Sequence, residues 1–289
     1  MEHSNFKEIP RYPRYGIQMR PLFLYLALLA IFSVAMYAAL TSFKMSGASI
    51  KILSIIYMWT PTLATVIVLR SGKAILDVLG EFRLKWYLIA GLVPLIHLAL
   101  VRLILSSQWI DPSLVLFLLK GINVSTTKLL VEGLVAGYTV NAVVALGEEI
   151  GWRGFMFKVL RGNRLTKSIV IGTVWALWHW PLIVLGYLNF PQSKALGIPI
   201  FALTLIPMTY VMLFFREREG VYSTAVLHGV TNGVLGMEYL ALSQLPDWLR
   251  PPSGLWGALA WIIIATAITA IEKMISRSSS LALPVRSER

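Results

Sequence analysis

The sequence predicts an all-α integral membrane protein with about eight transmembrane helices and with both termini in the cytoplasm. Composition, the spacing of apolar runs and the distribution of basic residues carry this prediction. Of the 289 residues, 57% are hydrophobic and only 14% are charged, and the mean hydropathy is +0.71. Soluble domains have about a quarter charged residues, so this composition is typical of a membrane protein.

A helix needs about 20 mostly apolar residues to cross the bilayer. The runs that meet this condition are residues 21–43, 50–69, 87–105, 129–148, 168–188, 197–215, 221–245 and 254–273. The stretch 112–119 is too short to span and is interpreted as a re-entrant or interfacial turn. We expect one membrane domain over 21–275, a basic cytoplasmic tail over 1–20 and a disordered cytoplasmic tail over 276–289.

Lysine and arginine are concentrated in alternate loops. With the N-terminus inside, the two tails and the loops 70–86, 158–167 and 216–220 carry 18 of the 26 basic residues, whereas the outside loops carry six. This bias is the pattern that sets membrane orientation. It also explains the net charge of +12 without nucleic acid as a partner. The absence of cysteine excludes disulfides, thiolate metal sites and a cysteine nucleophile.

Charged residues interrupt the fourth apolar run at GEEIGWRGF, which contains Glu148, Glu149 and Arg153. Charge in such a segment is costly and persists mainly where it is paired or does chemistry. Glu149 and Arg153 are four residues apart, so on a helix they share a face and can pair. Glu148 is rotated by about 100° and has no nearby cation in the sequence. We therefore interpret Glu148 as a candidate general base and the other two as its brace.

Two further segments place polar side chains in the membrane: WALWHWP, with His179, and LHGVTNG, with His228 and Asn232. Counted from the predicted cytoplasmic helix ends, these residues lie about 10–16 Å deep at 1.5 Å per residue. His228 and Asn232 share a helix face and can either join helices or donate to a developing oxyanion. Asn141, two turns before Glu148, is either a supporting residue or plain helix packing.

Glu148, His179 and His228 form a donor set that also suits zinc. The spacing is not HExxH, and a glutamate–histidine pair can activate water without a metal. No cofactor is favoured, and zinc on these three residues is the alternative. His97, in the third apolar run, has no polar partner at helical spacing except Arg102 and is interpreted as structural or pore-lining.

The ordered motifs EExxxR, aromatic-xxx-His and HxxxN resemble those of the CPBP family of intramembrane proteases. This family includes CAAX prenyl endopeptidases and bacteriocin-processing or abortive-infection proteins. The second motif commonly begins with phenylalanine, and a tryptophan takes its place here. Within a core of about residues 130–240, the motifs are Glu148-Glu149-x-x-x-Arg153, Trp175-x-x-x-His179 and His228-x-x-x-Asn232.

The resemblance implies an eight-helix fold with a catalytic chamber open toward the cytoplasm. By analogy, Glu148 and His179 would hold and activate the hydrolytic water, and His228 and Asn232 would stabilise the oxyanion. The expected supporting residues are Glu149, Arg153, Trp175 and Asn141.

The sequence therefore predicts a multi-pass membrane hydrolase, an intramembrane protease that cleaves a peptide bond near the cytoplasmic membrane face. Its expected partners are the lipid bilayer and a CAAX-type, lipidated or otherwise membrane-associated protein. A prokaryotic cell membrane is the favoured location, or the endoplasmic reticulum if the source is eukaryotic. The alternative is a non-catalytic membrane scaffold or immunity protein with the same fold. A proton-coupled transporter is less favoured, because the chain shows no repeat symmetry and no paired broken helices.

Overall fold

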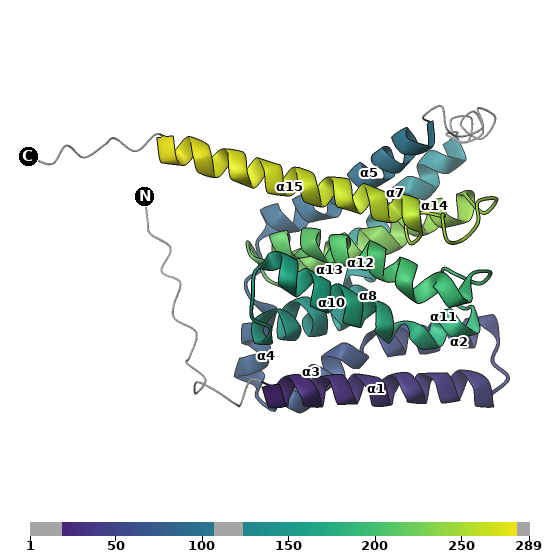
Figure 1. The fold of residues 1–289 in the computed structure, drawn as a ribbon. Coiled ribbons are helices and arrows are strands. Elements are labelled where there is room, and N and C mark those ends of the chain that lie inside the picture. Colours follow the sequence, from purple (N-terminus) through teal and green to yellow (C-terminus); the bar gives the residue numbers. More distant parts are fainter. Residues whose placement is uncertain (1–18, 107–123, 282–289) are drawn as a thin grey trace, which may run out of the picture.

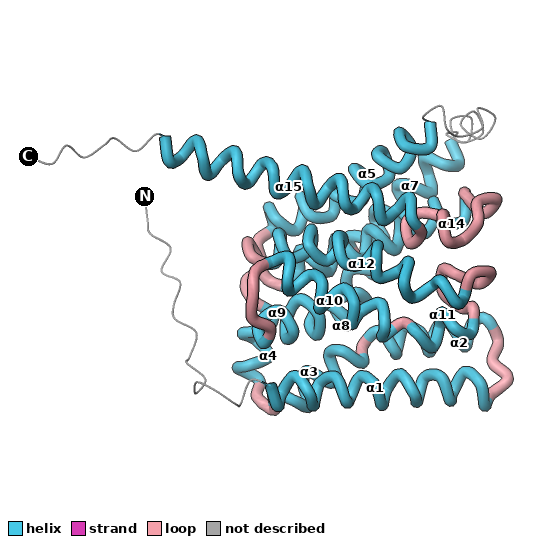
Figure 2. The backbone as a smooth tube through the Cα atoms, in the orientation of Figure 1, coloured by secondary structure: helices cyan, strands magenta, loops and turns pink. Residues whose placement is uncertain are grey.

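The computed structural model describes residues 19–106 and 124–281, and within these ranges all regular structure is helical (Figures 1 and 2). The predicted all-α class is confirmed. All eight apolar runs are helical over most of their described length. The stretch 112–119, predicted to be a re-entrant or interfacial turn, lies outside the described residues.

Four of the predicted spans are single long helices, and the others are divided into consecutive pieces. The long helices are α1 (Met19–Ser42), α5 (Leu84–Ser106), α12 (Lys194–Arg216) and α15 (Leu255–Leu281). The divided spans are α2 (Gly47–Met58) with α3 (Thr60–Leu69); α7 (Val124–Tyr138) with α8 (Val140–Glu149), the π-helix η1 (Ile150–Met156) and α9 (Phe157–Val159); α10 (Arg164–Trp178) with α11 (Trp180–Leu185); and α13 (Val221–Val230) with the π-helix η2 (Thr231–Leu235) and α14 (Gly236–Ala241). A short helix, α4 (Gly72–Leu79), lies between α3 and α5.

Within the described ranges, five helical segments are long and apolar enough to cross a membrane, or six if α7 and the helix that follows it count as one span bent by 50°. These segments identify a multi-pass membrane protein. The number eight stays a prediction, because the spans built from α10–α11 and from α13–η2–α14 are interrupted. The first and last described residues lie at the same end of the bundle, as an even number of crossings requires (Figure 1).

The two ends of the bundle differ in charge. The loops 70–86, 158–167 and 216–220 lie with α4 and α9 at the end where the described chain begins and finishes (Figure 1). These loops hold 10 basic residues, and we call this end the basic end. At the other end, here called the opposite end, lie α11, α14 and the loops 186–193 and 242–254 (Figures 1 and 2).

The C-terminal tail that was predicted to be disordered from residue 276 begins inside α15, which continues to Leu281. Ion pairs hold α15 against the basic end about one turn before residue 276: Glu272 accepts hydrogen bonds from Arg164 (2.7 Å) and from Arg218 (2.8 Å). These ion pairs anchor the helix near the end of its apolar part, which explains why the helix continues beyond the hydrophobic run. Residues 282–289 lie outside the described part of the chain.

Glycines at GxxxG spacing bring two helical segments into backbone contact. Gly133 and Gly137 lie on α7, and Gly229 and Gly233 lie on α13 and η2. A Cβ added to Gly229 would lie 2.5 Å from the backbone nitrogen of Ala142 and 2.6 Å from the carbonyl oxygen of Gly137. Small residues at this spacing are what allow close helix packing in membranes. The contact places α13 and η2, with the HxxxN motif, against α7 and α8, with the EExxxR motif.

We predict that Gly229→Ala destabilises the protein by about 1–3 kcal/mol, because the added methyl group has only backbone atoms to displace. Thermal unfolding of the purified protein in detergent measures this as a lower Tm. Gly72→Ala is the matched control, because no atom lies within 4 Å of its added Cβ. An equal Tm for the two variants would show that the close contact is not needed.

Candidate active site

Each of the three motifs lies where a helix departs from regular α geometry. Glu148 and Glu149 end α8 directly before η1, and His179 lies at the break between α10 and α11. His228 lies in the last turn of α13, and Asn232 lies in η2. Single π-helical turns are rare in proteins, but a large share of those that occur lie at functional sites. The irregular backbone therefore singles out the same three segments as the sequence motifs.

The helix break at His179 determines which nitrogen of its imidazole ring carries the proton. Pro181, two residues later, lacks an N–H and interrupts the helical hydrogen bonds. The backbone N–H of His179 bonds the carbonyl of Ala176, and its Nδ1 lies 2.7 Å from the carbonyl oxygen of Trp175. A carbonyl oxygen can only accept, so Nδ1 carries a proton. The Nε2 lone pair of neutral His179 is therefore left for a proton or another ligand.

His228 is held by a buried ion pair. Its Nδ1 lies 2.9 Å from Glu149 Oε1, which also accepts a hydrogen bond from Arg153 Nη1 at 3.0 Å. Arg153 and Glu149 are fully buried, and Arg153 Nη2 donates to Thr209 Oγ1 at 2.7 Å. The predicted pairing of Glu149 with Arg153 is present, and the same carboxylate also orients His228.

Glu148 lies in a different environment from its neighbour. Its Oε2 accepts hydrogen bonds from the indole Nε1 atoms of Trp175 (2.5 Å) and Trp152 (3.3 Å). Within the described residues, no basic side chain pairs with Glu148 and no hydrogen bond reaches its Oε1. The carboxylate is thus fixed by neutral donors through one oxygen, and the other oxygen is free to act on a ligand.

Trp175 connects the groups of the site. The Arg153 guanidinium lies over its ring at 4.1 Å, and its ring centroid lies 5.2 Å from that of His228 and 6.1 Å from that of His179. Its Nε1 also holds Glu148. A phenylalanine, the usual residue at the start of this motif, would keep the ring contacts but could not donate this hydrogen bond. The exchange to tryptophan therefore adds a support for the carboxylate.

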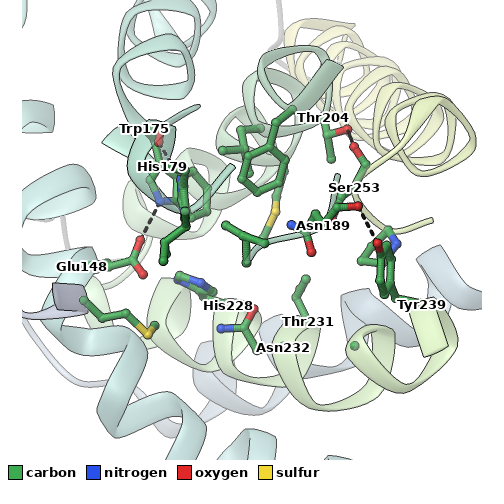
Figure 3. A pocket seen from close by; sticks show the side chains of 18 of the residues that line it. Glu148, Trp175, His179, Asn189, Thr204, His228, Thr231, Asn232, Tyr239 and Ser253 are labelled. Atoms are coloured by element: carbon green, nitrogen blue, oxygen red, sulfur yellow. Dashed lines mark hydrogen bonds between the residues drawn. The ribbon is translucent and has the colours of Figure 1, made fainter. Parts of the chain in front are cut away.

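A cavity of about 430 Å³ lies in front of these groups and is lined by Glu148, His179, His228 and Asn232 (Figure 3). The four residues predicted to be catalytic thus face one chamber. Its remaining walls are mostly apolar or aromatic and come from α2, α10–α12, α14, α15 and the loops at the opposite end. They include Tyr57, Trp178, Leu182, Phe201, Leu205, Met208 and Trp261.

The chamber reaches the loops at the opposite end of the bundle. Its lining includes Tyr187, Leu188 and Asn189 of the loop 186–193, and no residue of the basic loops. The chamber therefore lies away from the basic loops, and the side of the membrane to which it opens stays a prediction. Counting residues from helix ends gave the depth of the site but not the end at which side chains close the bundle.

Asn141, predicted to be either a supporting residue or helix packing, does not line the chamber. Its Nδ2 donates to the carbonyl of Gly229 at 3.3 Å. It therefore joins α8 to the helix that carries His228. His97 also lies outside the chamber lining. Its Nε2 bonds the carbonyl of Gly257 at 3.1 Å, which fits the structural interpretation.

Sequence reasoning missed Trp152 and Thr209. Trp152 follows Glu148 by four residues, so the spacing that predicted the Glu149–Arg153 pair could have found it. Thr209 is 56 residues from Arg153 in the chain, and no local pattern connects the two.

The donor atoms of Glu148, His179 and His228 bear on the zinc alternative. Within the described residues, no three histidine, aspartate or glutamate side chains gather closely enough to hold a metal ion. The Oε2 of Glu148 receives two indole donors, and the Nδ1 atoms of His179 and His228 each face an oxygen acceptor. A zinc ion would have to bind through Glu148 Oε1 and the Nε2 atoms of the two histidines, and the zinc alternative stays a prediction.

Residues 129–234 match the family model for type II CAAX prenyl endopeptidase Rce1-like. A CAAX prenyl protease 2 from Methanococcus maripaludis is 34% identical over 110 residues, which cover 35% of this chain and 40% of that protein. The match thus spans less than half of the curated relative. Because residues 129–234 contain all three motifs, the resemblance to the CPBP family is confirmed over this segment.

We predict that Arg153→Met lowers stability by about 3–5 kcal/mol, because it leaves the buried Glu149 carboxylate without its cation. Thermal unfolding in detergent measures the loss. Arg218→Met is the control: this ion pair with Glu272 is about 30% exposed on both sides and should contribute about 1 kcal/mol or less. If Arg153→Met unfolds at the same temperature as the control, Arg153 is not the brace of the site.

Proposed function

We propose that this chain is an intramembrane endopeptidase in which Glu148 activates the water that hydrolyses a peptide bond. The observation that carries this proposal is the contrast between the two adjacent carboxylates. Glu149 is bound to Arg153 and His228, whereas Glu148 has only indole donors and faces a chamber with two oriented histidines. The family match over residues 129–234 supports the same class of reaction.

The first step uses the two free acceptors on the chamber wall, Glu148 Oε1 and His179 Nε2. A water molecule that donates a hydrogen bond to each would have its oxygen directed at a substrate carbonyl. Glu148 takes one proton from this water as its oxygen attacks the carbonyl carbon. When the tetrahedral intermediate collapses and the C–N bond breaks, the same proton passes to the leaving amine. The carboxylate is thereby restored.

The developing oxyanion needs donors, and His228 and Asn232 lie next to each other on the chamber wall (Figure 3). The amide of Asn232 donates directly. In its imidazolium form His228 donates through Nε2–H while Nδ1–H stays on Glu149. Loss of one such donor typically costs about 10²–10³-fold in rate. Glu149, Arg153 and Trp175 therefore act by holding the residues that touch the substrate.

The substrate class follows from the walls and from the relative. The apolar and aromatic lining suits a peptide that is lipidated or embedded in the membrane. The name of the Methanococcus relative, CAAX prenyl protease 2, makes a CAAX-type protein one member of this class. The bilayer itself is the second partner, and a cell membrane is the location.

We predict that Glu148→Gln lowers peptide cleavage by reconstituted protein at least ~10²-fold, because the amide keeps the shape of the side chain but cannot take a proton. Glu132→Gln is the matched control, because Glu132 is exposed on α7 and pairs only at the surface with Lys128. Circular dichroism and thermal unfolding verify that both variants fold. Full activity of Glu148→Gln would exclude the assigned mechanism. Specific peptide binding by wild-type protein without cleavage would favour the scaffold alternative.

We further propose that the reaction needs no metal, since the donor geometry offers no three-ligand site within the described residues. Treatment with EDTA or 1,10-phenanthroline followed by dialysis should leave the cleavage rate unchanged, and added zinc should not raise it. Elemental analysis of the purified protein is the independent measurement. Activity that is lost with chelator and restored by zinc, together with stoichiometric zinc in the protein, would contradict this proposal.

A further inference from the structure

The chamber has a fixed mouth at the opposite end of the bundle. Two loops form its rim, residues 186–193 and 242–254, and we call them the rim loops. Asp247 in the second rim loop accepts hydrogen bonds from the backbone N–H groups of Gln192 (2.6 Å) and Ser193 (3.1 Å) in the first. The mouth is therefore tied together across the two loops.

Two helices also form hydrogen bonds to the rim loops. Tyr239 on α14 donates its hydroxyl hydrogen to the carbonyl of Asn189 at 2.5 Å, and Thr204 on α12 donates to the carbonyl of Ser253 at 2.8 Å. All four residues line the chamber, and Figure 3 shows them on the side away from Glu148. The polar rim and the catalytic residues thus lie at the two ends of one cavity.

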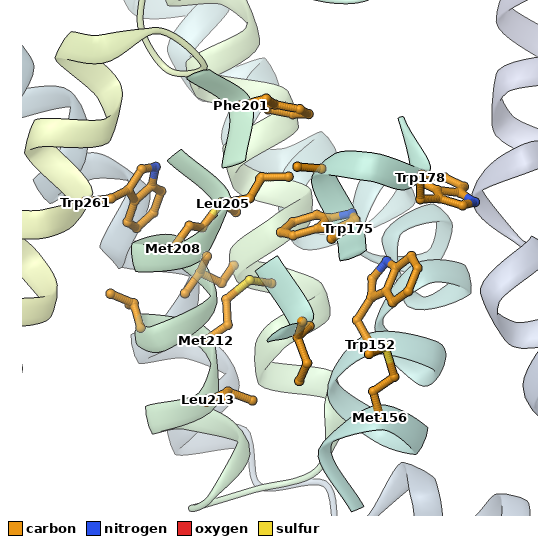
Figure 4. Packing of buried hydrophobic residues seen from close by; sticks show 14 of the residues in the cluster. Trp152, Met156, Trp175, Trp178, Phe201, Leu205, Met208, Met212, Leu213 and Trp261 are labelled. Carbon is orange, nitrogen blue, oxygen red and sulfur yellow. The ribbon is translucent and has the colours of Figure 1, made fainter. Parts of the chain in front are cut away.

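Toward the basic end, packed side chains close the bundle. Trp152, Phe155 and Met156 of η1 are fully buried, and Leu213 and Phe215 of α12 are buried with them. Figure 4 shows Trp152, Met156 and Leu213 on the side of Trp175 that leads away from Phe201, which lines the chamber. An apolar layer thus separates the catalytic residues from the basic loops.

Arg216 connects the segments around this apolar layer by hydrogen bonds. Its guanidinium donates to the carbonyl of Arg153 at 2.8 Å, of Glu219 at 3.0 Å and of Val78 at 3.1 Å. These carbonyls belong to η1, to the loop after α12 and to α4. One buried cation therefore joins three segments of the basic end, and a passage there would have to break all of these bonds.

The charge of the two ends sets their place in the membrane. The basic loops carry 10 lysines and arginines, whereas the loops predicted to lie on the other side carry six, of which one, Arg250, lies in the rim loops. The guanidinium of Arg250 is tied down, with hydrogen bonds to the carbonyls of Ser243 (2.7 Å) and Leu245 (2.6 Å). Short loops rich in lysine and arginine stay in the cytoplasm. The basic end is therefore the cytoplasmic end, and the mouth lies at the other membrane face.

We infer that the chamber takes its substrate from the non-cytoplasmic face of the membrane. This inference rests on the proposed function for the existence of a substrate and adds the side from which it enters. The substrate class is then a peptide segment exposed at, or anchored in, the non-cytoplasmic leaflet. A lipidated peptide would enter with its anchor in that leaflet, because the layer of η1 and α12 closes the other end of the chamber.

The absence of cysteine makes the orientation directly measurable, since any introduced cysteine is unique. Leu240→Cys lies on the chamber lining at the mouth, and Leu76→Cys lies on α4 at the basic end; the two leucines are 71% and 68% exposed. Tyr187→Cys, at a position that is 49% exposed in a rim loop, is a second mouth variant. Each variant is expressed in a bacterial host, and spheroplasts are treated with a membrane-impermeant maleimide before and after permeabilisation.

We expect the mouth variants to react in intact spheroplasts and Leu76→Cys to react only after permeabilisation. Reaction of Leu76→Cys in intact spheroplasts, or protection of both mouth variants until permeabilisation, would overturn the inference. The labelling does not depend on activity. If it follows the expected pattern while the reconstituted protein cleaves nothing, the proposed function fails and the orientation stands. If cleavage occurs and the labelling is reversed, the orientation alone fails.

A second measurement tests whether the substrate reaches the catalytic residues through the mouth. In reconstituted protein, a bulky maleimide on Leu240→Cys should reduce cleavage several-fold relative to the unmodified variant. The same reagent on Leu76→Cys should have no effect, because α4 lies outside the chamber lining. Equal loss at both positions, or loss at Leu76→Cys alone, would contradict entry through the mouth.

Discussion

The close approach of α7 and α8 to α13 and η2 is the contact on which the site depends. Because Gly137 and Gly229 lack side chains, the two backbones come near enough for His228 to reach Glu149 at 2.9 Å. Asn141 crosses the same contact to the carbonyl of Gly229. Lipid tails are as apolar as helix surfaces, so burial alone does not drive helices together in a membrane. Here small residues allow the approach, and buried polar bonds fix its register.

Once this contact is made, the two adjacent carboxylates fall into different surroundings. The turn from α8 into η1 directs Glu149 toward Arg153 and His228, and it directs Glu148 toward the indoles of Trp152 and Trp175. A buried ion pair is strongly destabilised when one partner is lost, which suits Glu149 to bracing. A carboxylate that is held only by neutral donors keeps an oxygen for chemistry. The division of roles thus follows from helix geometry and not from any difference between two glutamates.

Local spacing predicted a large part of this arrangement. Apolar runs located the helices, and the i, i+4 rule paired Glu149 with Arg153. Counting along the spans placed His179 and His228 in the same half of the membrane. The closed layer could not be predicted in this way, because η1 and α12 are far apart in sequence and meet only in the fold. The same holds for the bond from Trp175 to Glu148, across 27 residues. Residue spacing describes one helix at a time, whereas the mouth and the closed layer are each formed by several helices.

The helix breaks explain why the hollow lies toward one end. Backbone that leaves helical geometry at membrane depth is tolerated where it is buried in protein or lines a cavity. After the break at His179 only the six residues of α11 remain, and after η2 only the six of α14; both short pieces lead to the opposite end. Beside them α12 runs unbroken to the basic end and supplies part of the closed layer. The irregularities that orient the catalytic groups therefore also shorten the spans around them, so the site and its mouth have one structural origin.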